Sequence, residues 1–151
     1  MRVLTTLAAS IVAACATGCM TGTPDPDGGL DPQVSSNDCA VILALAKEHY
    51  DFGPDNPPPP LKPAGDDLWR PVCNTESAGF TFRPYADPPP GSDPRQTMQW
   101  VAFHKPVYDG QGAVVLTEIV HGPLAGIGYE CRLHSGIAGW TVGECKTSWV
   151  S

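Results

Sequence analysis

Hydrophobic and polar residues alternate through the last third of the chain, which is typical of β-strands. Within residues 126–134, Ile127, Tyr129, Cys131 and Leu133 fall on one side, and polar or charged residues fall on the other. Pairs of turn-forming residues that include glycine separate this segment from its neighbours. The pattern predicts an antiparallel meander of about four strands, at residues 98–105, 113–121, 126–134 and 140–150.

The spacing of apolar residues becomes helical further upstream. One stripe of such a helix would consist of Val41, Ile42, Leu45, His49 and Phe52. Residues 35–38 offer N-cap side chains, and the glycine-proline pair at 53–54 would end the helix. We therefore expect one helix at residues 38–51 that covers one face of the sheet. The predicted fold class is α+β, as a single domain at residues 38–151.

Proline divides the chain: fifteen of its 17 prolines lie at or before Pro94, so the last third is free to form a sheet. Residues 54–96 contain two proline runs, at 57–60 and 88–90, and are predicted to form a stiff surface loop. Within this loop, Phe80 and Phe82 alternate with polar residues, which predicts an edge strand at 78–83. We expect Trp69 to pack the loop onto the domain.

The N-terminus has the pattern of an exported lipoprotein. Residues 3–14 form an uncharged run behind Arg2, and the run closes on Val12-Ala13-Ala14-Cys15, which resembles the bacterial lipobox. The prediction is a lipoprotein signal peptide at residues 1–14 and an acylated Cys15, with Cys19 as the alternative. Residues 15–37 then form an acidic linker rich in proline, glycine and serine, which would connect the domain to a lipid bilayer.

The residues after the candidate anchors bear on the destination of the protein. Neither Cys15 nor Cys19 is followed by aspartate. By resemblance to lipoprotein sorting, this favours the outer membrane, facing the periplasm, over retention in the inner membrane. The bacterial cell envelope outside the cytoplasm is oxidising, so the remaining cysteines are candidates for disulfides.

Four cysteines of the predicted domain, Cys39, Cys73, Cys131 and Cys145, allow three pairings, and the sequence alone does not choose among them. A hairpin would bring Cys131 opposite Cys145, which leaves Cys39 for Cys73. Trp140 and Val142 have the opposite parity to Cys145, and a β-bulge near Gly143 would reconcile them. If Cys15 is the anchor, five cysteines remain and one of them is unpaired; if Cys19 is the anchor, four remain and can all pair.

The C-terminal third contains several short motifs: Pro106-Val107-Tyr108, the glycine-rich turn at 122–128, Trp140-Thr141-Val142 and the terminal Trp149-Val150-Ser151. In these motifs the chain resembles a widespread class of uncharacterised bacterial exported proteins. Members of that class end in a β-meander and a closing W-x-V … W-[IV]-S motif. The resemblance implies export and this fold, and it implies no established activity. Ala125 stands where members often have a cysteine, so no disulfide or metal role transfers to the turn.

Charge and motif content narrow the function classes. With 9 Lys and Arg against 16 Asp and Glu, the net charge of −7 excludes a nucleic-acid partner that depends on a basic surface. No catalytic motif, metal-ligand motif or cofactor motif is present, so we assign no catalytic residue, metal or cofactor. His49, without a partner one helical turn away, is interpreted as a rim or hydrogen-bonded histidine rather than a ligand.

Three functions follow as hypotheses. The first is a membrane-anchored envelope lipoprotein that acts as a binding or structural module. Such a module could bind a protein partner through its proline-rich loops. The second is a periplasmic inhibitor or protective protein, with Trp69 and Tyr85 as its contact surface. The third is a small metal-dependent or acid/base hydrolase. It would require His104, His121 and His134 to converge with Glu118 or Glu130 on one sheet face.

Overall fold

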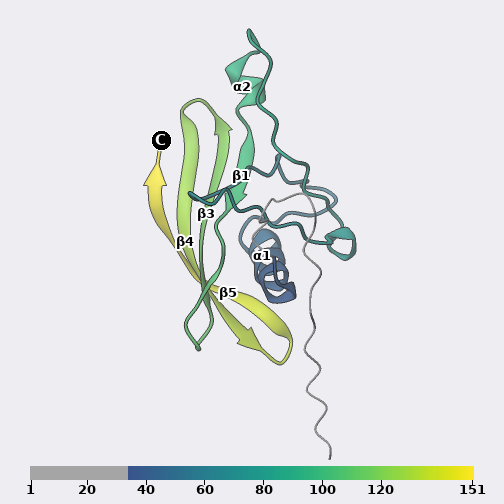
Figure 1. Ribbon diagram of the computed structural model, residues 1–151, viewed down its shortest axis with the longest axis vertical. Helices are drawn as coiled ribbons and strands as arrows, with labels where there is room; N and C mark the ends of the chain where they lie inside the picture. The colour runs from purple at the N-terminus through teal and green to yellow at the C-terminus, as the bar shows by residue number, and fades with distance from the viewer. Residues whose placement is uncertain (1–33) are drawn as a thin grey trace, which may run out of the picture.

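The computed structural model describes residues 34–151, in which one helix packs against an antiparallel sheet of five strands (Figure 1). The fold is therefore α+β, as predicted. The elements are α1 (Ser36–Glu48), the 3-10 helix η1 (Glu76–Ala78), α2 (Pro94–Thr97), β1 (Trp100–Phe103), β2 (Val107–Tyr108), β3 (Ala113–Gly122), β4 (Ala125–Gly136) and β5 (Gly139–Val150). The signal peptide, both candidate acylated cysteines and most of the linker lie outside the described residues. No helix within 34–151 has the length and apolar character needed to cross a bilayer.

Helix α1 begins at a capping box. The Ser35 hydroxyl accepts a hydrogen bond from the Asp38 backbone N–H at 3.0 Å, and the Asp38 carboxylate accepts one from the Ser35 N–H, also at 3.0 Å. The helix therefore starts two residues before the predicted position. It also ends earlier, at Glu48, because the chain turns at Asp51, whose φ of 55° lies in the left-handed region.

The sheet has the order β1-β3-β4-β5, with β2 paired to the other half of the β3 edge. Its four long strands match the predicted segments to within a few residues. Cys131 faces Cys145, whereas Leu133 faces Val142, so β5 has one more residue than β4 in this interval. This is the bulge that was predicted near Gly143, and it turns Val142 and Cys145 toward the same core.

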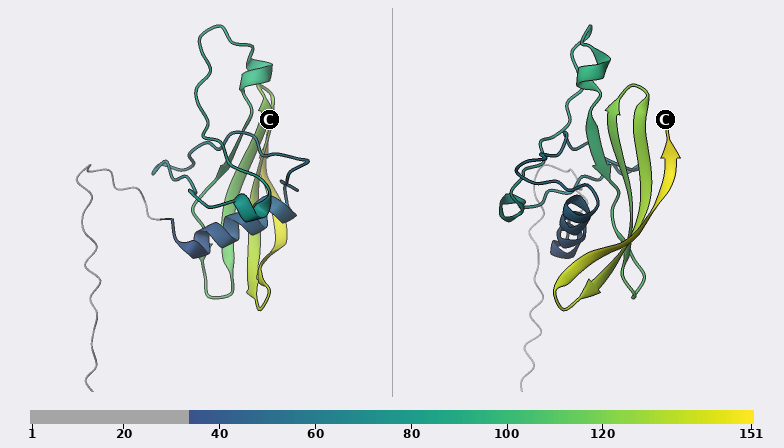
Figure 2. Two further views of the ribbon diagram at one scale, coloured as in Figure 1. Left: turned by 90° about the vertical axis from the view of Figure 1, so that its right-hand side faces the viewer. Right: turned by 180° about the vertical axis from the view of Figure 1, so that it is seen from behind.

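The core lies between α1 and the inner face of the sheet, as the two further views in Figure 2 show. The largest fully buried side chains include Trp69, Phe103, Ile42 and Leu45. Two hydrogen bonds join β5 to the ends of α1: the Trp140 indole donates to Asn37 at 3.0 Å, and the Val142 N–H donates to Glu48 at 2.7 Å.

Residues 51–99 contain little regular structure and lie along the edge of the sheet at β1. The Lys62 N–H donates to the Val101 carbonyl at 2.8 Å, and the Val101 N–H donates to the Pro60 carbonyl at 3.0 Å. The predicted strand at 78–83 is wrong. This segment makes a 3-10 turn and then a single isolated bridge between Pro84 and Leu61. The bridge does not extend into a ladder because Pro59 and Pro63, two residues on either side of Leu61, have no N–H to donate.

Candidate binding pocket

A cavity of about 520 Å³ opens where the end of α1 meets the inner face of the sheet. His49 and Tyr50, directly after the helix, form one side of it. Ile119 on β3 and Tyr129 on β4 contribute to its floor, because their odd-numbered positions face the helix. The proline run at 57–60 forms the opposite wall. The cavity therefore lies between the regular part of the fold and the proline-rich loop.

Aromatic rings pack around the helix end. The His49 ring lies edge-on to Tyr50, with centroids 4.8 Å apart, and edge-on to Tyr129 at 4.5 Å. Tyr50 in turn stacks on Phe52 with centroids 5.2 Å apart and an interplanar angle of 11°. Burial lowers the pKa of His49, so near neutral pH its imidazole is uncharged. These contacts fix the rings and leave a rigid, largely apolar wall.

Tyr50 is anchored to the sheet through Thr117, which is fully buried. The Thr117 hydroxyl donates its one hydrogen to the Ala102 carbonyl at 2.8 Å, so the Tyr50 hydroxyl, 3.0 Å away, donates to Thr117. Burial raises the pKa of Tyr50 well above its usual value. Tyr50 therefore acts as a neutral, fixed part of the wall and is not suited to acid/base chemistry near neutral pH.

The polar part of the lining comes from the loop and the ends of β-strands. The Asn56 side-chain amide donates to the carbonyls of Tyr50 and Asp51, at 3.2 and 3.1 Å, which holds the start of the proline run against the helix end. Arg83, Gln99 and His121 complete the lining. Arg83 is the one permanently charged residue among them, and it forms no ion pair with a described residue.

The three histidines proposed for a hydrolase do not share a site. His104 lies on the outer face of the sheet, where its Nε2 is 3.5 Å from Glu118 Oε1. His134 also faces outward, next to Gly143 on β5, whereas His121 faces inward and lines the cavity. The convergence fails because the three residues differ in strand parity and in position along the strands. The cavity brings together His121 and His49 instead.

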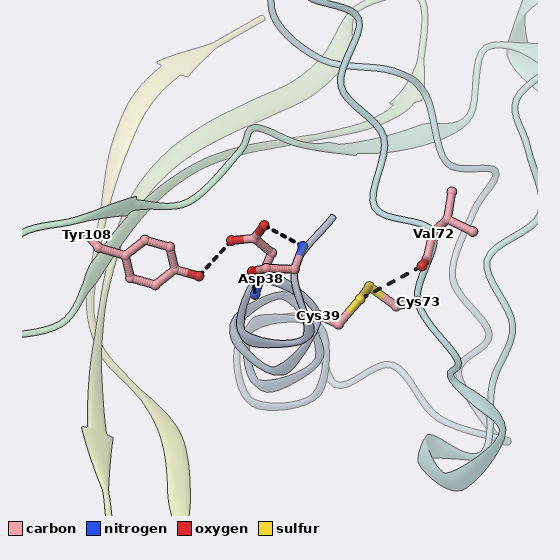
Figure 3. The surroundings of a disulfide bond; sticks show 6 residues. Asp38, Cys39, Val72, Cys73 and Tyr108 are labelled. Carbon is pink, nitrogen blue, oxygen red and sulfur yellow. Dashed lines mark hydrogen bonds between the residues drawn. A yellow bond between two sulfur atoms is a disulfide. The ribbon is translucent and has the colours of Figure 1, made fainter. Parts of the chain in front are cut away.

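Both predicted disulfides are present, Cys39–Cys73 and Cys131–Cys145. The first joins the start of α1 to the proline-rich loop (Figure 3). Beside it, the Tyr108 hydroxyl donates to the buried Asp38 carboxylate at 2.7 Å, which ties the helix N-terminus to β2. Burial, reinforced by this carboxylate, raises the pKa of Tyr108.

Reasoning from the sequence missed the pocket, although part of its signal was visible. His49 lies on the apolar stripe of the helix, and Tyr129 shares the core-facing parity of its strand with Cys131. The proline wall and Arg83 could not be placed, because their positions depend on contacts between distant parts of the chain. Trp69, expected both to pack the loop and to serve as a contact residue, is fully buried, so only the packing role is correct.

Comparison with models of protein families, with curated proteins and with solved structures found no match to this chain.

Proposed function

We propose that this protein is a lipid-anchored binding module of the bacterial cell envelope, in the outer membrane and facing the periplasm, whose cavity holds a small organic anion. The apolar run at residues 3–14 and the lipobox that ends at Cys15 support the anchor. Two disulfides in a chain of this size support an oxidising compartment. The cavity supports the binding role.

The shape of the cavity suits a small ligand. Its volume of about 520 Å³ lies within the range of small-molecule sites in proteins, roughly 300–1,000 Å³. The aromatic rings of its wall are held by contacts with one another, so these side chains lose little conformational entropy when a ligand enters. A flat apolar group would stack against Tyr50, Tyr129 or the His49 ring.

The observation that carries the proposed ligand class is the charge of the lining. The protein has a net charge of −7, yet no carboxylate is among the lining residues, and Arg83 supplies a guanidinium that has no ion-pair partner within residues 34–151. A guanidinium pairs best with a planar anion such as a carboxylate, through two parallel hydrogen bonds. The ligand is therefore a flat apolar body that carries one anionic group.

Binding of 2-naphthoate, compared with its neutral analogue 2-naphthol, tests this proposal by isothermal titration calorimetry. We expect the protein to prefer the carboxylate, and Arg83→Gln to weaken naphthoate binding several-fold, up to about tenfold, with little effect on naphthol. Arg95→Gln is the matched control, since Arg95 is an exposed arginine outside the lining. Equal affinities for the two probes, or an equal loss in both variants, would overturn the assignment of an anion.

The anchor has a separate test. The intact mass of the protein extracted from membranes, before and after reduction, should correspond to a chain that starts at an acylated Cys15 and contains two disulfides. Cys15→Ser should then retain the signal peptide, whereas Cys19→Ser should be processed normally. A mature mass without lipid would remove the proposed location and leave the binding proposal standing.

The two other hypotheses have less support. An inhibitor surface that includes Trp69 is excluded by the complete burial of that side chain. A hydrolase would need a base oriented by a carboxylate, and the cavity that contains His49 and His121 has no carboxylate in its lining.

A further inference from the structure

A second feature of the cavity wall lies behind His49. A ring nitrogen of His49 and the sulfur atoms of Cys131 and Cys145 all lie within 4.8 Å of one another. They come from three separate elements, namely the end of α1, β4 and β5. Cys131 is fully buried, whereas His49 and Cys145 are half-buried, so the group can be reached from one side.

We propose that reduction of the Cys131–Cys145 disulfide creates a site for a thiophilic divalent cation of the zinc class, with both thiolates and His49 as ligands. An imidazole and two thiolates are a ligand set that zinc accepts, with a fourth position left for water or another small ligand. This proposal does not depend on the anion-binding function. It concerns the reduced form of the disulfide that lies behind His49.

The distances required are close to those already present. Zinc binds sulfur at about 2.3 Å and imidazole nitrogen at about 2.0–2.1 Å, so the ligand atoms of a tetrahedral site lie roughly 3.5–3.8 Å apart. The sulfurs of a disulfide are about 2 Å apart and must separate by somewhat under 2 Å, a change that side-chain rotation can supply. The imidazole nitrogen needs to move by about 1 Å.

The surroundings of Cys145 favour this adjustment. The extra residue of β5 lies between Val142 and Cys145, so the strand beside this cysteine is not held by a continuous ladder. On the other side, Cys131 is in the middle of β4 and remains fixed by its pairing to Val115 on β3. One ligand can therefore move while the other stays in place.

The chemistry balances with a dithiol as the reductant. One thiolate of the reductant attacks the half-exposed Cys145 sulfur and releases Cys131 as a thiol. The second thiolate of the reductant then closes its own disulfide and releases Cys145. Two electrons and two protons reach the protein, and binding of the cation displaces both thiol protons.

The other disulfide provides an internal control. Among residues 34–151, the group at His49 is the one set of three metal-ligating side chains whose ligand atoms gather this closely. Cys39 and Cys73 form their disulfide at the helix start, and no histidine joins them. Reduction of that pair should create no comparable site.

Cobalt(II) provides a spectroscopic probe for the full chain with Cys15→Ser and Cys19→Ser, which removes the two N-terminal thiols. After reduction, we expect one Co²⁺ per chain, with the intense visible bands of tetrahedral cobalt and a near-ultraviolet thiolate charge-transfer band. Zn²⁺ should displace the cobalt and abolish both signals. The oxidised protein should show neither.

Three further variants, each made in that background, decide the ligand set. His49→Gln and the pair Cys131→Ala/Cys145→Ala should each weaken binding at least tenfold, whereas Cys39→Ala/Cys73→Ala should retain it. Equal binding in Cys131→Ala/Cys145→Ala would overturn the proposal, as would a reduced, folded protein that takes up no cobalt. Circular dichroism monitors folding, and a reduced chain that unfolds and is not refolded by Zn²⁺ would also overturn it.

Discussion

The proline-rich loop, residues 51–99, and the sheet region, residues 100–150, are of similar length and are ordered in different ways. In the sheet region each long strand after β1 pairs with its neighbour in the chain, and the β3–β4 and β4–β5 ladders run the length of the strands with three register shifts between them. The loop has one 3-10 turn, one short helix and a few isolated bridges. Local sequence therefore specifies the sheet, whereas separate long-range contacts specify the loop.

The loop depends on a small number of apolar anchors. Phe52, Leu61, Trp69 and Phe80 are buried in the common core, and they hold between them a chain that is mostly exposed. Leu61 also makes the main backbone contacts, since its N–H donates to the Arg83 carbonyl at 2.7 Å and its carbonyl accepts from Tyr85 at 2.9 Å. Because only a few anchors hold this long stretch of chain, loss of one should cost more in the loop than a comparable change in the sheet.

The largest effect is expected at Trp69. Trp69→Ala should lower the free energy of unfolding by about 3–5 kcal/mol, because it empties a fully buried site. Trp69→Phe should cost less, since it keeps a ring and removes the buried Nε1, which has no hydrogen-bond partner among the described residues. Urea unfolding measures both.

Val72→Ala is the control for this change, because Val72 lies in the same loop and is 74% exposed. Its effect should stay within about 0.5 kcal/mol. If Trp69→Ala cost no more than this control, the loop would not depend on its anchors, and the contrast with the sheet would be wrong.

A smaller effect is expected in the sheet, at Gly128. The Trp149 indole from β5 lies directly over this glycine, and a Cβ there would overlap the indole nitrogen. Gly128→Ala should therefore cost about 1–3 kcal/mol through overpacking. Gly122→Ala is the matched control, since a Cβ at that glycine of the same hairpin meets no atom within 4 Å.

Thermal or urea unfolding of the double variant Gly128→Ala/Trp149→Ala separates overpacking from a general loss of strand stability. If the indole is the cause, the double variant should be no less stable than Trp149→Ala alone. Additive losses would show that Gly128 is needed for another reason.

The same contrast explains what the sequence could and could not predict. The sheet segments, the bulge near Gly143 and the hairpin disulfide Cys131–Cys145 followed from parity and turn residues, which are local properties. Cys39–Cys73 was expected only as the remaining pair, because the sequence did not choose among the three pairings. The strand at 78–83 failed although Phe80 and Phe82 alternate with polar residues. Their rings instead pack together at 5.2 Å against the core, and Pro59 and Pro63, on either side of Leu61, cannot donate to a ladder with this segment.

The pocket could not be predicted for the same reason. Its walls come from the helix end, the sheet floor and the proline run, and their meeting depends on where the Asn56 amide and the Leu61 backbone place the loop. Only its floor was visible in the sequence, because Ile127 and Tyr129 share the parity of the core positions. His121 and His134 were correctly placed on strands, whereas His104 lies just after the end of β1 at Phe103. The sheet faces and strand positions of these residues keep His104 and His134 apart from His121.

The smallest effect is expected at His49, where the two regions meet, and it depends on pH. Burial lowers the pKa of His49 below the ordinary histidine value of 6.5, so the unfolded chain binds this proton at a higher pH than the folded protein does. The contribution of His49 to the free energy of unfolding is therefore fully present above about pH 6.5. It falls as the pH drops toward the folded-state pKa, and then levels off. Partial solvent exposure keeps the effect small.

His49→Gln should flatten this part of the pH dependence, which urea midpoints of the oxidised protein between about pH 7.5 and about pH 5 measure. His134→Gln, at an exposed position on the other face of the sheet, should leave the slope in place. If the slope is lost in both variants, it arises from general surface charge. Loss of the slope in His49→Gln alone would assign it to His49, whose burial in the aromatic wall disfavours the charged imidazole.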